Sequence, residues 1–206
     1  MSVVFDNQTK IPVMESFYTL QGEGFHTGRA AHFIRLAGCD VGCVWCDVKE
    51  SWDVHPNQVE SIENLVQDCV TNKVDFVVLT GGEPAMYDLR PLISRLKKET
   101  IYTSIETSGV YELLGDVDWY TFSPKKFKKP CEEAYQKANE LKVVIYHKSD
   151  FAWAQEHQQK VNANCLLYLQ PEWSKREEIT PLIVEFIKEN PRWTLSLQTH
   201  KYINIP

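Results

Sequence analysis

The sequence predicts an α/β fold with a mostly parallel sheet, either an incomplete (βα) barrel or an open doubly wound sheet. Short apolar segments typical of buried strands alternate with segments whose apolar residues recur at helical spacing. Strands joined through helices in this way pair in parallel, with right-handed crossovers. Polar or glycine-rich clusters directly follow several strand-like segments. Because both folds bind ligands at the carboxyl ends of their strands, these clusters predict one shared site.

Seven segments are predicted to be strands, and five segments between them to be helices. Residues 31–36 alternate as a strand should and lead directly into a cysteine-rich loop. Residues 75–79 form a nearly continuous apolar run, typical of a strand buried on both faces. The other predicted strands are 103–106, 119–122, 143–146, 166–169 and 194–197, and the predicted helices are 61–72, 89–99, 132–141, 150–161 and 177–189.

Length and charge limit the class of protein. With 206 residues, 43% of them hydrophobic, the chain can bury one core and is predicted to form a single domain over 1–206. A net charge of −6 argues against a broad nucleic-acid-binding surface, and the short basic run 125–129 is interpreted as a solvated loop. No signal peptide or membrane-crossing run is recognisable, so a cytoplasmic protein without membrane contact is expected.

Three cysteines, Cys39, Cys43 and Cys46, lie on one short loop after the first predicted strand. Thiolates are soft ligands that suit iron-sulfur clusters or zinc. Three ligands on a four-iron cluster would leave one iron open to a small molecule. Zinc would need a fourth ligand, and the nearest histidine is His55. Small buried cysteines are the remaining alternative, and Cys69, on an apolar helical stripe, is interpreted in that way.

Two further patterns point to the same site. Gly81-Gly82-Glu83-Pro84 follows a predicted strand, where glycines allow a ligand to approach the backbone, although a plain turn would give the same pattern. Arg35 stands in an otherwise apolar strand next to the cysteine loop. A buried guanidinium needs a partner. Either a substrate carboxylate or a carboxylate of the protein would satisfy Arg35.

The spacing Cys39-x3-Cys43-x2-Cys46, with Trp45 before the last cysteine, resembles the signature of the radical S-adenosylmethionine (SAM) superfamily. The resemblance implies a barrel of the radical SAM type and a 4Fe-4S cluster whose fourth iron binds SAM, from which an electron releases a 5′-deoxyadenosyl radical. It also implies SAM contacts at the later strand ends. The residues carried over as cofactor-binding are Gly82, Glu83, Ser123, Pro124, Lys125, Gln170, Pro171, Glu172 and Trp173.

The motifs at 20–24, 35–39, 46–47, 80–84 and 197–201 together resemble the 7-carboxy-7-deazaguanine synthase family nearly end to end. This family converts 6-carboxy-5,6,7,8-tetrahydropterin to 7-carboxy-7-deazaguanine with loss of ammonia, a step toward queuosine and other 7-deazapurines. The resemblance implies that Arg35 binds the substrate carboxylate. It also places the C-terminal carboxylate of Pro206 in the site, although a chain end would otherwise be expected to fray. The implied substrate-binding residues are Leu20, Gln21, Gly22, Glu23, Arg35, Thr80, His200 and Pro206.

Two positions depart from the family pattern. Family members commonly have a Mg²⁺-binding Thr or Ser where this chain has Val48, so magnesium would bind through Asp47 or water, or would not be needed. Trp173 replaces a smaller polar residue, which leaves its contact open. The resemblance further implies a homodimer and a low-potential electron donor, a flavodoxin or ferredoxin. The alternatives are a radical SAM activase that places a glycyl radical on a partner enzyme and a non-catalytic zinc-binding module.

Overall fold

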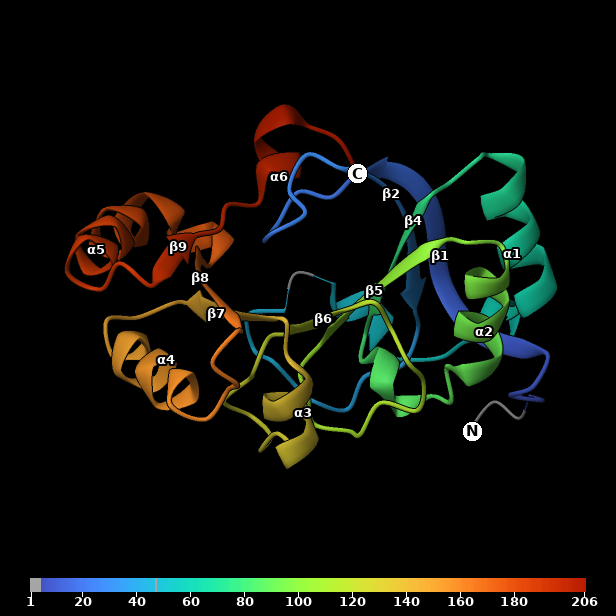
Figure 1. The fold of residues 1–206 in the computed structure, drawn as a ribbon, viewed down its shortest axis with the longest axis horizontal. Helices are drawn as coiled ribbons and strands as arrows, with labels where there is room; N and C mark the ends of the chain where they lie inside the picture. Colours follow the sequence, from blue (N-terminus) through green and yellow to red (C-terminus); the bar gives the residue numbers. More distant parts are fainter. Residues whose placement is uncertain (1–4, 47) are drawn as a thin grey trace.

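The computed structural model of the chain describes residues 5–46 and 48–206, which fold as a strongly curved sheet with helices along its outer side (Figure 1). The strands are β1 Lys10–Leu20, β2 Ala30–Leu36, β3 Val59–Ser61, β4 Phe76–Gly81, β5 Tyr102–Thr107, β6 Trp119–Phe122, β7 Glu140–Ile145, β8 Leu166–Pro171 and β9 Trp193–Leu195. The α-helices are α1 Ile62–Thr71, α2 Arg90–Lys98, α3 Glu132–Lys137, α4 Asp150–Gln158, α5 Arg176–Glu189 and α6 Thr199–Ile203. Short 3₁₀ helices are η1 Lys49–Ser51, η2 Pro56–Gln58, η3 Pro84–Met86 and η4 Trp173–Lys175.

The strand order distinguishes between the two predicted architectures. Within the described residues the order is β3-β1-β2-β4-β5-β6-β7-β8-β9, and every pair from β2 onward is parallel. A doubly wound sheet would reverse its direction of growth at a switch point, whereas the parallel strands from β2 to β9 follow one another in a single direction. The sheet does not close on itself, because no pairing joins β1 to β9 among the described residues. The predicted incomplete (βα) barrel is therefore confirmed.

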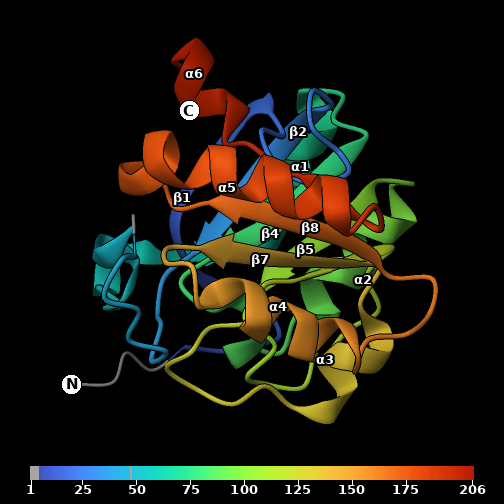
Figure 2. The ribbon, with the colours of Figure 1, turned by 90° about the vertical axis from the view of Figure 1, so that its left-hand side faces the viewer.

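The main core lies between the outer face of the sheet and the helices, which cover that face in Figure 2. Helix α1 turns its apolar stripe inward, with Ile62, Leu65 and Cys69 buried, because these residues share one helical face. The prediction that Cys69 is a core residue is confirmed. No helix among the described residues has the length and apolar character that a bilayer crossing requires.

Aromatic side chains fill the lower end of the barrel interior. Phe76 packs with Tyr102, while Phe25 stacks on Trp119 with ring centroids 4.8 Å apart and His26 packs between these groups. Strand residues alternate between the two faces of a sheet. Nearer the carboxyl ends, the inward positions are polar in several strands and face a cavity. The aromatic residues close this cavity at the amino-terminal ends of the strands.

The structure corrects several predicted boundaries. Strand β1 and the short β3 pair antiparallel at the sheet edge and were not predicted, since the polar residues of β1 interrupt a simple alternation. The predicted helix 132–141 ends at Lys137, and strand β7 already begins at Glu140. Helix α6, which follows β9, was also not predicted. Lys125 faces the central cavity and Lys126 pairs with Asp150, so the run 125–129 is not simply a solvated loop.

Candidate active site

A cavity of about 260 Å³ opens at the carboxyl ends of the strands. Its wall combines the cysteine loop, the turn after β4, the ends of β5 to β8, the loop after β1 and the last residues of the chain. Pro124 does not line the cavity. Every other residue predicted for the site lines it: Leu20, Gln21, Gly22, Glu23, Arg35, Cys39, Cys43, Cys46, Thr80, Gly82, Glu83, Ser123, Lys125, Gln170, Pro171, Glu172, Trp173, His200 and Pro206.

The cysteine loop is held at its start by backbone bonds to the segment that follows it. Gly38 N–H donates to Ser51 O at 2.6 Å, and Cys39 N–H donates to Trp52 O at 3.1 Å. All three thiols are free, and burial raises the pKa of Cys43 to about 11. Among residues 5–46 and 48–206, no three His, Cys, Asp or Glu side chains gather closely enough for one metal ion. All three thiols line the cavity.

The turn after β4 packs directly against the cysteine loop. Gly82 N–H donates to Leu36 O, and Glu83 N–H donates to Gly38 O, each at 2.9 Å. A Cβ atom at Gly82 would lie 2.2 Å from Gly38 O and 2.9 Å from the Cβ of Cys39. Only glycine permits this approach. The turn after β4, which is predicted to bind the cofactor, and the cysteine loop are therefore in close backbone contact.

Glu83 lines the cavity, but its side chain is buried and bonded within the scaffold. Its carboxylate is buried and accepts bonds from Ala85 N–H at 3.0 Å, Thr107 Oγ1 at 2.5 Å and Ser108 N–H at 2.8 Å, and also from the Ser108 hydroxyl. These bonds tie the end of β4 to the end of β5. A contact between Glu83 and a cofactor would therefore come from the backbone of this residue.

The ends of β6 and β8 supply the other side of the cavity. Lys125 Nζ donates to Ser123 O at 2.9 Å and to Ser123 Oγ at 2.6 Å, and burial lowers the pKa of Lys125. Gln170 Oε1 accepts from Ser196 Oγ at 2.8 Å, which fixes its amide. The ring of Trp173 packs against Tyr202 of α6 and lies 4.3 Å from the Arg176 guanidinium.

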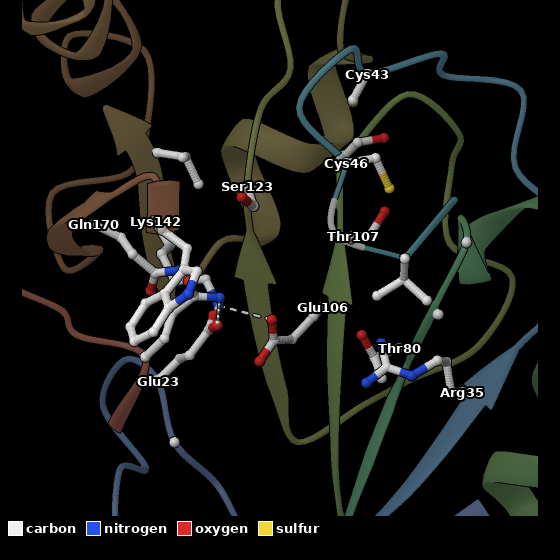
Figure 3. Close-up of a pocket in the computed structure, with 18 of the residues that line it drawn as sticks. Glu23, Arg35, Cys43, Cys46, Thr80, Glu106, Thr107, Ser123, Lys142 and Gln170 are labelled. Carbon is white, nitrogen blue, oxygen red and sulfur yellow. Dashed lines mark hydrogen bonds and ion pairs between the residues drawn. The ribbon is translucent and has the colours of Figure 1, made fainter. Parts of the chain in front are cut away.

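Arg35 and Thr80 lie side by side on β2 and β4, at the opposite wall from Gln170 (Figure 3). Arg35 Nε donates to Glu15 Oε1 at 2.6 Å, so a carboxylate of the protein, one of the two predicted possibilities, provides a partner. The Arg35 side chain is 21% exposed and lines the cavity. Its position remains compatible with a second anionic partner in the cavity.

A buried ionic network, absent from the predictions apart from Gln21 and Glu23, lies at the base of the cavity (Figure 3). Lys142 Nζ lies 2.5 Å from Glu23 Oε2 and 2.7 Å from Glu106 Oε2. Gln21 Nε2 donates to Glu106 Oε1, and Gln198 Nε2 donates to Glu23 Oε1, each at 2.9 Å. Burial opposes ionisation of Glu23, but the Lys142 ammonium outweighs it and holds the pKa of Glu23 at about 2.

Glu140 lies on β7 on the same inward face as Lys142, two residues earlier in the strand. Its carboxylate is buried and accepts from Phe25 N–H at 3.0 Å. Burial raises the pKa of Glu140 to about 7, although the nearby Lys142 ammonium opposes the shift. The sequence signal that could have identified Glu140 and Lys142 is their alternation with the apolar residues of β7, whereas Glu106 stands in the mostly polar strand β5 and has no such signal.

The loop after β1 and helix α6 close the gap between the edges of the barrel, where they lie next to each other in Figure 1. Thr199 N–H and Thr199 Oγ1 both donate to Gly22 O at 2.9 Å. Gly22 approaches His200 so closely that an added Cβ would lie 2.2 Å from Nδ1. Gly24 N–H donates to Ser196 Oγ at 3.0 Å. The predicted substrate-binding loop and the C-terminal segment thus form one wall.

Val48 lines the cavity and brings only carbon atoms in its side chain, so its side chain offers no oxygen ligand to a magnesium ion. Asp47, the other predicted possibility for that ion, lies outside the described residues. The side chain at position 48 therefore cannot take the role that a Thr or Ser hydroxyl would have.

Comparison with known proteins gives consistent matches. Residues 33–145 match the Radical SAM superfamily. The chain is 52% identical over 206 residues to the 7-carboxy-7-deazaguanine synthase of Flavobacterium psychrophilum, covering 100% of this chain and 98% of the relative. It is 47% identical to that of Synechocystis sp., covering 94% and 93%. The crystal structure of QueE from Escherichia coli matches with a TM-score of 0.83 and 32% identity, covering 91% and 93%.

Proposed function

Because the chain belongs to the 7-carboxy-7-deazaguanine synthase family within the radical SAM superfamily, we propose that it is a lyase that converts 6-carboxy-5,6,7,8-tetrahydropterin to 7-carboxy-7-deazaguanine with loss of ammonia. The observation that carries the proposal is the cavity, which joins a three-thiol loop to a wall of polar acceptors and donors. Neither a zinc-binding module nor a glycyl-radical activase is favoured by these relatives, which match over 94–100% of the chain.

The thiols of Cys39, Cys43 and Cys46 would hold a 4Fe-4S cluster, with the Gly82 turn beside it for SAM. The donor set fits, since three free thiols face one cavity and thiolates suit iron-sulfur clusters. When bound, the cluster and SAM supply a low-potential electron and radical chemistry. Two segments carried over for SAM, 123–125 after β6 and 170–173 at the end of β8, would orient it in the cavity.

The substrate would lie on the opposite side of the cavity, between Arg35 and the ionic network. Arg35 would bind the pterin carboxylate, with Glu15 holding the guanidinium from the other side. Thr80 would bond the ring, and the loop Leu20–Gly22 would close over it together with His200 and Pro206. The acidic side chain of Glu23 would accept from ring N–H groups. A ring held this firmly has its reacting carbon fixed relative to the cofactor.

Further features of the proposal rest on the length and composition of the chain, for the single domain and the cytoplasm, and on the resemblance, for the homodimer and the electron donor. The protein would act in the cytoplasm as a single-domain homodimer and would receive electrons from a flavodoxin or ferredoxin. Magnesium, if used, would be bound without an oxygen from residue 48.

The test is product analysis after anaerobic reconstitution with iron, sulfide, SAM, a reductant and the carboxytetrahydropterin. Formation of 7-carboxy-7-deazaguanine is expected, together with loss of product in Cys43→Ala. Cys131→Ala is the matched control, because Cys131 does not line the cavity. Cleavage of SAM without this product would refute the substrate. A protein that binds no iron-sulfur cluster under these conditions would refute the radical SAM assignment.

A further inference from the structure

Lys142 lies between two carboxylates at the base of the cavity. Its side chain is 3% exposed, and its ammonium contacts Glu23 from the loop after β1 and Glu106 from β5 (Figure 3). Each carboxylate keeps its second oxygen bonded to an amide, from Gln198 and Gln21 respectively. Both carboxylates are 15–19% exposed and line the cavity. The network is thus one cation that orients two anions from different elements.

The charges around Lys142 leave a surplus of negative charge. Glu23 and Glu106 outnumber the single ammonium, and Glu140 lies on the same inward face of β7. The other charged or titratable groups that influence the network are Lys125 after β6 and His200 on α6. Burial would lower the pKa of Lys142, but Glu106 and Glu23 raise it well above its usual range. The ammonium therefore stays charged at any working pH.

We propose that Lys142 is a positioning residue that fixes Glu23 and Glu106 as two purely accepting carboxylates for the N–H groups of the aminopyrimidine ring of the substrate. This inference rests on the proposed function and deepens it. An ionised carboxylate accepts hydrogen bonds but cannot donate them. Two such groups held at one wall match a ring edge that carries adjacent N–H donors.

Without the Lys142 ammonium, the two carboxylates would no longer match the N–H donors of the ring. Two carboxylates that share a site without a cation cannot both stay ionised, so one takes up a proton. That carboxyl group then presents an O–H donor toward the donors of the ring. The loss of affinity is expected to depend on pH, unlike the effect of a merely loosened fold.

The experiment compares Lys142→Met with wild type in pterin titrations from pH 6 to 9. We expect weaker binding by about 10- to 100-fold near neutral pH, since charged hydrogen bonds are replaced by mismatched ones. The affinity should recover partly as the pH rises. The double variant Lys142→Met/Glu106→Gln, which removes one cation and one anion, should lose that pH dependence. Lys137→Met is the control, because Lys137 pairs with Glu133 on the exposed side of α3.

Unfolding without substrate gives a second readout that is independent of the proposed function. Lys142→Met should lose stability relative to wild type as pH rises from 5 to 8, because the folded state then holds uncompensated buried carboxylates. If Lys142→Met does not fold, Lys142→Gln, which also removes the charge but keeps a hydrogen-bond donor for the carboxylates, carries both measurements. If Lys142→Met showed the same pH dependence as wild type in both pterin binding and unfolding, the proposed role of Lys142 would be overturned. A wild-type protein that does not bind the pterin would instead overturn the proposed function.

Discussion

Replacing Glu83 by alanine should destabilise the protein strongly even though this residue lines the cavity. The carboxylate is 1% exposed and accepts from the backbone N–H groups of Ala85 and Ser108, and from the hydroxyls of Thr107 and Ser108. The hydroxyls can turn to other acceptors, but the two buried N–H groups cannot. Each orphaned group costs about 1–3 kcal/mol, so we expect a loss of about 4 kcal/mol.

Thermal unfolding of the apoprotein, followed by circular dichroism, measures this loss. For a chain of this size each kcal/mol lowers Tm by about 2–4 °C, so Glu83→Ala should unfold about 8–16 °C below wild type. Glu83→Gln keeps the shape and one acceptor, and should lose about half as much. Glu178→Ala is the control, because its partner Lys175 is a surface group 3.4 Å away. A Glu83→Ala protein within 2 °C of wild type would refute the scaffold role.

Three other substitutions test separate parts of the structure. Gly82→Ala should cost about 1–3 kcal/mol and lower the iron content after reconstitution, because the added Cβ meets Gly38 O; an unchanged iron content would contradict this. Burial lowers the pKa of His157 to about 4, so the stability that its neutral ring contributes should be present above pH 6.5 and lost as the pH falls toward 4. Urea unfolding at pH 7 and pH 4.5 should show His157→Gln losing less of its stability on acidification than wild type, whereas equal losses would refute the idea. Trp173→Ala removes the ring packed on Tyr202 and should speed hydrogen exchange in α6, while Trp173→Phe retains slow exchange; equal rates in both would argue against docking through this ring.

Local patterns were sufficient to predict that the cysteine loop and several strand-end clusters line one cavity. The cysteine loop and the turn from Gly81 to Pro84 each follow directly after an apolar strand, so their place at the carboxyl end of the sheet follows from the strand itself. The same holds for Ser123 after β6 and Gln170 at the end of β8. Parallel pairing then brings these ends together without any information on register.

The ionic network was not predicted because it depends on register and on long-range closure. Glu106 and Lys142 stand inside strands, and a charge there faces either the helices or the interior according to the pleat. Their partner Glu23 comes from a loop far away in the sequence. Strand β1 was not predicted because its polar residues break the alternation typical of a strand. Its pairing with the short strand β3 cannot be read from the sequence pattern. Helix α6 has too few residues to show helical periodicity.

The two walls of the cavity are built by different means, and this bears on how ligands bind. The wall proposed for the cofactor depends on backbone contacts between neighbouring strands, such as Glu83 N–H with Gly38 O. The wall proposed for the substrate joins the loop after β1 to the segment after β9 by bonds such as Thr199 to Gly22, across the gap that the open barrel leaves. Lys142 reaches this wall from the sheet through Glu23. Because an open barrel edge lacks a strand ladder to hold it, these hydrogen bonds and the ion pairs of Lys142 hold it together, and the order of the wall proposed for the substrate therefore depends in part on the ionic network.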